Sequence, residues 1–317
     1  MLRSFSKNLS FSALLLFLLC GLQMWPGVTH AEDDYLMAIR DPQTDPSQNY
    51  LVQLLQAALE ASKPQYGPYK LSTEILSMQR RRVLVELQSG QLVNVGIQLT
   101  SPDWEQALLP IRIPVDKGLT NFRIALIDGR RQEEFSHIKS LQQLRQLAVG
   151  VGEQWATRDL YYQNDLHVVT GNSNSGMAGM LMQGRFDYFP RSVEEAVRET
   201  KALSPSNPNL AMEKTFMIYL PVPRYFFISP HAPRLAERLK AGLEKLIASG
   251  DFDRAFRDYY GPAIVEAGLC GRTIFRLKNA SLSPETPLER RNLWFDPFSG
   301  ADRKLACGAA DKPRKTP

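Results

Sequence analysis

Arg191 is the residue whose type and position most directly suggest binding chemistry. It follows the strand-like run 186–190 and precedes a segment in which Ser192 and Glu195 form a capping-box pattern for a helix. Open α/β sheets bind ligands beyond the carboxyl ends of their strands, and a guanidinium can hold a carboxylate or phosphate through two parallel hydrogen bonds. The position therefore predicts a cleft residue that binds an anion. The alternative is an ordinary ion pair with Glu194 or Glu195, which would be worth about 0–1 kcal/mol on the surface.

Three more side chains are candidates for the same cleft. Arg40 ends the first predicted strand, residues 35–39, and so meets the same criterion as Arg191. Trp155 follows a glycine-rich turn and is a candidate wall of the pocket, while Tyr188 lies in the strand before Arg191 and is a candidate for stacking on a ligand. For both aromatic residues, packing in the core is the alternative.

Motifs of catalysis are missing from the sequence. It contains no H-E-x-x-H, no G-x-S-x-G and no phosphate-binding loop. The four histidines are scattered, and neither Cys270 nor Cys307 has a metal-ligand spacing to one of them, so we predict no metal and no cofactor. A hydrolase or dehydratase with Glu153 or Glu213 as general base remains an alternative.

The N-terminus has the pattern of a secretory signal peptide. Arg3 and Lys7 precede the apolar run 11–22, and small residues stand at the positions expected before cleavage near Ala31. The run is shorter than the roughly 20 residues that span a bilayer, although an uncleaved anchor is the alternative. We therefore predict a soluble periplasmic protein.

Charge and cysteine content agree with an exported protein. The chain carries 38 Lys and Arg against 33 Asp and Glu, without a concentrated basic face, so we predict no nucleic-acid partner. Cys270 and Cys307 could pair in an oxidising compartment, or they could be two free thiols.

Strand-like and helix-like stretches alternate along the chain, which favours an α/β fold. Strands are predicted at 35–39, 69–76, 92–100, 123–128, 148–152, 166–171, 186–189, 210–220 and 224–229. Helices are predicted around 51–59, 78–87, 141–147, 154–165, 174–183, 192–203, 233–249 and 252–260. Residues 260–299 read as irregular, with 272–277 as a candidate extended stretch, and the tail from Gly300 reads as disordered.

The order of these parts resembles the type II periplasmic solute-binding proteins, in particular the extracellular proteins that serve polar amino-acid ABC transporters. The resemblance covers about residues 35–260. It rests on "RRRVLVELQSGQLVNVGI", "IPVDKGLTNFRIAL", "IKSLQQLRQLAVGVGEQW", "MLMQGRFDYFPRS" and "LAERLKAGLEKLIASGDFDRAFRDYY".

The resemblance implies two α/β lobes with a central cleft and two crossing strands. It places residues 32–124 and 222–299 in lobe 1 and residues 125–221 in an inserted lobe 2, after a signal peptide at 1–31 and before a disordered tail at 300–317. It also implies a monomer that binds a small molecule, needs no cofactor, is no enzyme, and presents its closed form to an inner-membrane permease or a sensor.

The sequence departs from the family where the ligand is usually held. Trp104 stands about where lobe 1 is expected to supply an arginine, and Arg191 or Ser192 stands where lobe 2 is expected to supply an acid. Arg112 lies near the expected crossing as a hinge or cleft charge. These departures favour an anionic or aromatic solute over an ordinary α-amino acid. A third possibility is an interaction protein whose cleft no longer binds a solute.

Overall fold

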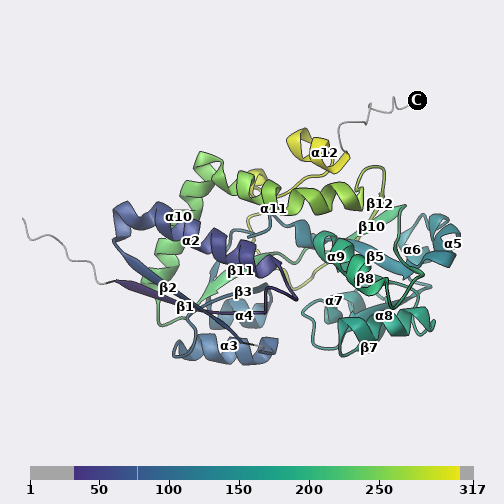
Figure 1. The fold of residues 1–317 in the computed structure, drawn as a ribbon, viewed down its shortest axis with the longest axis horizontal. Coiled ribbons are helices and arrows are strands. Elements are labelled where there is room, and N and C mark those ends of the chain that lie inside the picture. Colours follow the sequence, from purple (N-terminus) through teal and green to yellow (C-terminus); the bar gives the residue numbers. More distant parts are fainter. Residues whose placement is uncertain (1–31, 77, 308–317) are drawn as a thin grey trace, which may run out of the picture.

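The computed structural model describes residues 32–76 and 78–307, and the predicted signal peptide, residues 1–31, lies outside this range. The chain forms two α/β lobes that lie side by side (Figure 1). The predicted fold class is therefore confirmed. No helix in the described ranges has the length and apolar character needed to cross a bilayer.

The first lobe is built on a five-stranded sheet in the order β2-β1-β3-β11-β4. Strand β1 pairs in parallel with both β2 and β3, whereas β11 is antiparallel to both β3 and β4. The strands are β1 (Asp33–Ile39), β2 (Tyr69–Ile75), β3 (Val95–Leu99), β4 (Leu109–Ile111) and β11 (Arg224–Ile228). The helices of this lobe are α2 (Ser47–Tyr66), α3 (Arg80–Ser89), α4 (Pro102–Ala107) and α10 (Pro233–Ser249).

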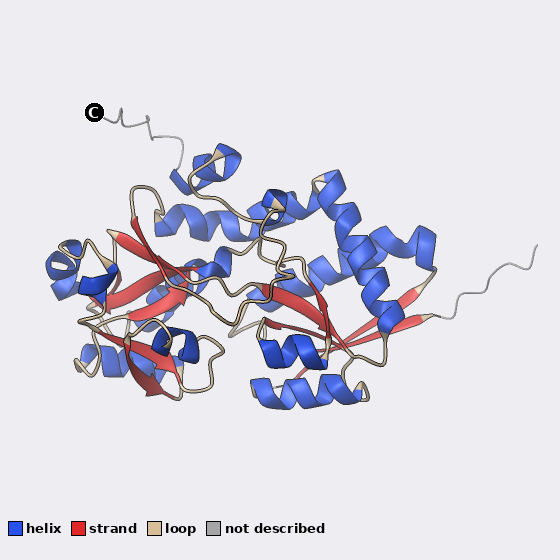
Figure 2. Ribbon diagram, turned by 180° about the vertical axis from the view of Figure 1, so that it is seen from behind, coloured by secondary structure: helices blue, strands red, loops and turns tan. Residues whose placement is uncertain are grey.

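The second lobe contains a sheet in the order β12-β10-β5-β8, with β9 also paired to β5, and a parallel β6-β7 pair that a bridge from Val149 to Tyr188 joins to it. Helices flank the strands (Figure 2). The strands are β5 (Phe122–Asp128), β6 (Ala148–Gly152), β7 (His167–Gly171), β8 (Phe189–Ser192), β9 (Leu210–Met212), β10 (Phe216–Tyr219) and β12 (Thr273–Arg276). The helices are α5 (Gln132–Ser136), α6 (Leu141–Leu144), α7 (Arg158–Tyr162), α8 (Asn174–Met182) and α9 (Val193–Leu203), and α11 (Asp251–Ala267) packs against α9 as well as α2 and α10.

Two segments, 112–121 and 220–223, connect the lobes and are hydrogen bonded to each other. The Asn121 carbonyl accepts a bond from the Leu220 N–H at 2.8 Å, and its side-chain oxygen accepts one from the Val222 N–H at 3.0 Å. The adjoining strands β5 and β10 then pair through Phe122 with Tyr219. These bonds fix the two crossings side by side beneath the cleft.

The chain crosses between the lobes again after α11, which the sequence did not predict. Strand β12 pairs in parallel with β10, so residues 273–276 belong to the second sheet and not to lobe 1. Residues 277–299 then return over the connection, where the Phe295 N–H donates to the Lys117 carbonyl at 2.7 Å and Arg290 pairs with Glu244 of α10 at 2.7 Å. The other expected lobe boundaries stay a prediction.

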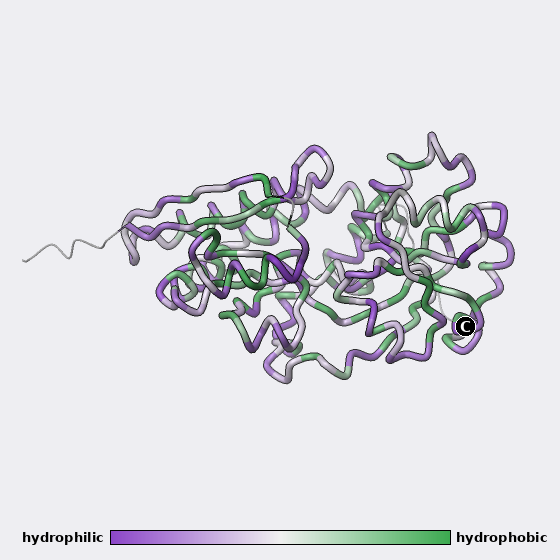
Figure 3. Tube along the Cα trace, turned by 90° about the horizontal axis from the view of Figure 1, so that it is seen from below, coloured by the Kyte–Doolittle hydropathy of each residue, from purple (hydrophilic) through white to green (hydrophobic). Residues whose placement is uncertain are grey.

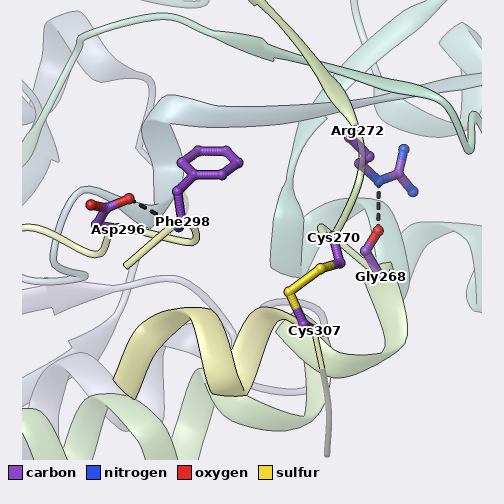
Figure 4. The surroundings of a disulfide bond; sticks show 6 residues. All are labelled: Gly268, Cys270, Arg272, Asp296, Phe298 and Cys307. Carbon is purple, nitrogen blue, oxygen red and sulfur yellow. Dashed lines mark hydrogen bonds between the residues drawn. A yellow bond between two sulfur atoms is a disulfide. The ribbon is translucent and has the colours of Figure 1, made fainter. Parts of the chain in front are cut away.

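Residues 300–307 form helix α12 (Gly300–Cys307), so the expectation of a disordered tail from Gly300 was wrong for this part. A disulfide joins Cys307 to Cys270 in the turn after α11 (Figure 4). Ala306 is buried against α11, and the covalent link holds the short helix there. Residues 308–317 lie outside the described range.

Two strand predictions differ from the structure for identifiable reasons. The expected strand 210–220 is interrupted because the Glu213 carboxylate accepts hydrogen bonds from the N–H groups of Thr215 and Phe216, which forms a turn between β9 and β10. Strand β8 lies three residues later than the run 186–189, because Pro190 and Arg191 pair with β5.

Hydrophobic stretches run through both lobes (Figure 3). The largest buried cluster joins α2, α10 and α11 to Phe122 and Ile124 of β5, so it continues across the connection. A second cluster fills lobe 2, and a third lies under α3 and α4 around Trp104. Apolar packing at the connection supports the relative placement of the two sheets.

Replacing Gly242 with alanine should destabilise the protein by about 1–3 kcal/mol, since overpacking a tight contact costs this amount. Gly242 lies in α10 where this helix crosses α2, and an added Cβ would stand 1.9 Å from the Ala58 carbonyl oxygen. Denaturant unfolding measures the change. Gly179→Ala in α8 is the matched control, because its Cβ would meet nothing within 4 Å and alanine favours the helix. Equal effects of both substitutions would contradict the close approach of the helices.

Candidate ligand-binding cleft

A cavity of about 800 Å³ lies between the lobes. Lobe 1 lines it with the ends of β1 and β3 and the start of α3, and lobe 2 lines it with residues 152–157 and the β8–α9 region. The connecting segment 112–121 contributes Thr120, and the adjoining strand β5 contributes Arg123. On one side the lobes meet directly, because the Arg198 guanidinium of α9 donates to the Thr44 carbonyl at 3.3 Å. A molecule in this cavity would contact both lobes and their connection.

Basic side chains outnumber acidic ones around the cavity. The basic residues are Arg40, Arg80, Arg123, Arg191, Arg198 and Arg224, and the acidic ones are Asp45, Glu153 and Glu195. No lysine or histidine lines the cavity within the described residues. The positive charge is therefore carried by guanidinium groups, which bind planar oxyanions through two parallel hydrogen bonds.

Arg191 lies in the cavity wall, as predicted, but its guanidinium already has a partner. Its Nε and Nη2 each bind one oxygen of the Glu199 carboxylate at 2.7 Å, and Nη2 also lies 3.1 Å from Glu195. The guanidinium stacks over the Trp155 ring, 4.3 Å from its centre. Both side chains of the Arg191–Glu199 pair are 5% exposed. Arg191 is thus part of a buried ion pair that the sequence analysis did not foresee.

The pKa directions agree with this network. Burial opposes the charged form of Arg191, but Glu195 and Glu199 outweigh it and raise the pKa of the guanidinium. Burial would raise the pKa of the Glu195 carboxyl, yet Arg191 and Arg123 lower it well below its usual range. Both groups stay charged at neutral pH, as an ion pair requires.

Two other cavity arginines also have carboxylate partners. Arg40 donates from Nε to Asp45 at 2.8 Å, and Arg198 donates from Nε to Glu194 at 2.9 Å. Arg40 lies at the end of β1, as the sequence predicted, but its guanidinium group is already hydrogen bonded to the Asp45 carboxylate.

Arg80, Arg123 and Arg224 differ from these. None of the three has a carboxylate within 4.0 Å in the part of the chain that the structure describes. Arg224 reaches only the Ser47 hydroxyl at 3.5 Å, and Arg123 has two buried nitrogens, Nε and Nη2, without any acceptor. The cavity therefore carries an excess of guanidinium charge that its own acids do not neutralise.

Arg80, which the sequence patterns did not single out, lines the cavity, whereas the predicted Trp104 does not. Trp104 is buried in the cluster under α3 and α4, with an edge contact to Phe227, and does not line the cavity. Arg80 lies over its ring at 4.6 Å and also bonds Gln98 and Ser101. The tryptophan thus supports an arginine instead of contacting a ligand.

Two further predicted residues lie away from the cavity. Arg112 pairs with Glu105 and with Glu285 of the returning segment, both at 2.7 Å, because it faces the side of the connection that this segment covers. Tyr188 is fully buried in the core of lobe 2, where its strand runs beside β6. Trp155 does line the cavity, stacked on Phe189.

The two candidate general bases are placed differently. Glu213 is fully buried and bonds backbone N–H groups in the β9–β10 turn, outside the cavity lining. Glu153 lines the cavity, and its carboxylate pairs with Arg158 at 2.8 Å. Of the two alternatives for a general base, Glu153 therefore lies at the cavity and Glu213 does not.

The sequence matches no model of a known protein family and no curated protein. Among solved structures, the chain is similar to an ancestral arginine-binding protein bound to glutamine, with a TM-score of 0.53 and 16% identity over 73% of this chain and 100% of that one. It is similar to the GluR0 ligand-binding core in complex with L-glutamate, with a TM-score of 0.52 and 13% identity over 73% and 99% of the two chains.

A third similar structure is a probable amino-acid ABC transporter extracellular-binding protein from Bacillus subtilis, with a TM-score of 0.52 and 13% identity over 72% of this chain and 98% of that one. At these identities the similarity concerns the fold. The chain has the two-lobe fold of the type II periplasmic amino-acid-binding proteins.

Proposed function

We propose that this chain is an exported solute-binding protein that captures a small anionic solute in the cavity between its lobes. The observation that carries this proposal is the set of three cavity arginines without a carboxylate partner, Arg80, Arg123 and Arg224. Arg123 is buried, and Arg80 and Arg224 are half-buried. A buried cation without a direct partner is costly, and an anionic ligand would supply that partner.

The acidic residues of the cavity support an anion over an ordinary α-amino acid. An α-ammonium group needs a free carboxylate, but Asp45 is bound by Arg40, Glu195 by Arg191 and Glu153 by Arg158. A zwitterion would therefore leave its ammonium without a strong partner. We propose binding in preference to hydrolysis, since Glu153, the candidate general base that lines the cavity, is paired with Arg158 at 2.8 Å.

The biological setting follows from the same proposal. Cleavage near Ala31 would release the mature protein into the periplasm, where the Cys270–Cys307 disulfide is stable. The lobes would close over the solute by bending at the two crossing segments, and a monomer would present this closed form to an inner-membrane permease or a sensor.

Acetate, succinate, citrate and phosphate should raise the melting temperature of the mature protein, measured by thermal shift, while glucose and lysine should not. A ligand at a hundredfold excess over its Kd adds about 2.7 kcal/mol, which corresponds to about 5 °C for a chain of this size. Chloride at matched ionic strength is the control for screening of surface charge. The proposal fails if no anion shifts the melting temperature or if glucose gives the largest shift.

A further inference from the structure

We propose that the solute carries at least two acid groups, one bound by Arg123 of β5 and Arg224 of β11, which flank the connecting segments and form a connection site, and the other bound by Arg80 at the start of α3. This inference rests on the proposed function and specifies its ligand. The observations behind it are the different positions of these arginines around one cavity and the vacant hydrogen-bonding groups of Arg123.

Arg123 is a buried cation whose guanidinium group still has hydrogen-bond donors available. Its side chain belongs to β5, lines the cavity and is 4% exposed, and its Nε and Nη2 have no acceptor among the described residues. The same two nitrogens of Arg191 hold both oxygens of Glu199 at 2.7 Å. In Arg191 a carboxylate thus binds the two nitrogens that have no acceptor in Arg123. Arg123 lacks a carboxylate or a similar oxyanion in this position. An anion would reach it when the lobes part.

Arg224 adds a second positive charge near Arg123. Both arginines lie close enough to the buried Asp116 to oppose the rise in its pKa that burial causes. Asp116 does not neutralise either of them by contact, since its carboxylate accepts bonds from the Gly118 N–H and the Thr120 hydroxyl. Glu195 and, for Arg224, Asp45 also act on these guanidinium groups through space, but among the described residues no carboxylate lies within ion-pair distance of either arginine.

Arg80 supplies a second positive group to the cavity, from lobe 1. It begins α3 in lobe 1, where Trp104, Gln98 and Ser101 fix its guanidinium. Burial lowers its pKa to about 10, so it is still charged at neutral pH. A single small acid group bound at Arg123 would leave this second cation with only the through-space attraction of Asp103 and no carboxylate in contact.

These two sites define the ligand by its chemistry. A guanidinium fork accepts a carboxylate or a phosphoryl group equally well, so the shared requirement is two oxyanion groups on one small molecule. The cavity of about 800 Å³ is within the usual range of about 300–1,000 Å³ for small-molecule sites. Di- and tricarboxylates and diphosphates meet this requirement.

Isothermal titration calorimetry with acetate, succinate, citrate and pyrophosphate tests the inference. We expect the wild-type protein to bind at least one of the three polyanions about tenfold or more tightly than acetate. Arg80→Gln should remove this preference, because it should weaken binding of the polyanions about tenfold or more and binding of acetate, which has one acid group, by less. Arg123→Gln should weaken binding of every anion by about 10- to 100-fold, as expected for lost charge-assisted hydrogen bonds.

Arg82→Gln is the matched control, since Arg82 lies two residues from Arg80, is exposed and pairs with Glu86. It should bind all four probes like the wild type. Arg123→Lys, which keeps the charge and loses the fork, provides a second variant, and both Arg123 variants should melt no lower than wild type without ligand. The inference is overturned if acetate binds as tightly as the polyanions, if Arg80→Gln weakens acetate and polyanions equally, or if both Arg123 variants bind normally. Absence of any anion binding would instead overturn the proposed function.

Discussion

Replacing Arg191 with alanine should lower the free energy of unfolding by about 3–5 kcal/mol, because it leaves the buried Glu199 carboxylate without its partner. Both side chains are 5% exposed, so water cannot replace the two hydrogen bonds of 2.7 Å that join them. The stacking of the guanidinium on Trp155 is lost as well. Urea unfolding of the ligand-free protein measures the effect.

Three further variants show whether burial is the cause. Glu199→Ala should destabilise by a similar amount, and the Arg191→Met/Glu199→Leu double variant should recover most of the loss, since apolar pairs often replace buried ion pairs without cost. Arg198→Ala, which breaks a more exposed pair with Glu194, should cost about 1 kcal/mol or less. If Arg191→Ala unfolds like the wild type but no longer binds anions, Arg191 is a ligand-binding residue, as the sequence first indicated.

Local patterns predicted most elements but not their long-range partners. Apolar periodicity located β1, α2 and α10, and the capping box at Ser192 located the start of α9. Such local patterns could not show that β12 joins the second sheet, because its partner strand β10 lies more than fifty residues earlier in the chain. Residues 300–307 look polar enough to be disordered, but they form a helix that a disulfide joins to Cys270, and the sequence left this pairing open.

The site was predicted less well because it is made by tertiary contacts. The sequence analysis considered Glu194 and Glu195 as partners of Arg191, whereas the main partner is Glu199, one helical turn beyond Glu195 on the same face of α9. Arg123 was overlooked although an arginine in the apolar run of β5 is itself a signal, since a buried charge needs a counter-ion.

Replacing both Cys270 and Cys307 with serine should lower the free energy of unfolding by about 4 kcal/mol. The disulfide closes a loop with a sequence separation of 37 residues, and the chain-entropy relation for a loop of this length gives about 4 kcal/mol. That loop contains β12 and the segment 277–299 that returns over the connection, so it restricts the unfolded chain in parts that belong to both lobes. Urea unfolding under oxidising conditions measures the difference.

The control is wild-type protein unfolded with a reductant, which should match the double variant, while the double variant should not respond to the reductant. Hydrogen exchange separates global from local effects. If the loss is below about 1 kcal/mol and faster exchange is confined to α12, the disulfide only holds that short helix in place. The segment 277–299 would then be held by its own contacts, such as the pairing of Arg290 with Glu244 and the bond from the Lys117 ammonium to the Asn292 carbonyl. A loss near 4 kcal/mol with faster exchange in both sheets would mean that the disulfide stabilises the two lobes together.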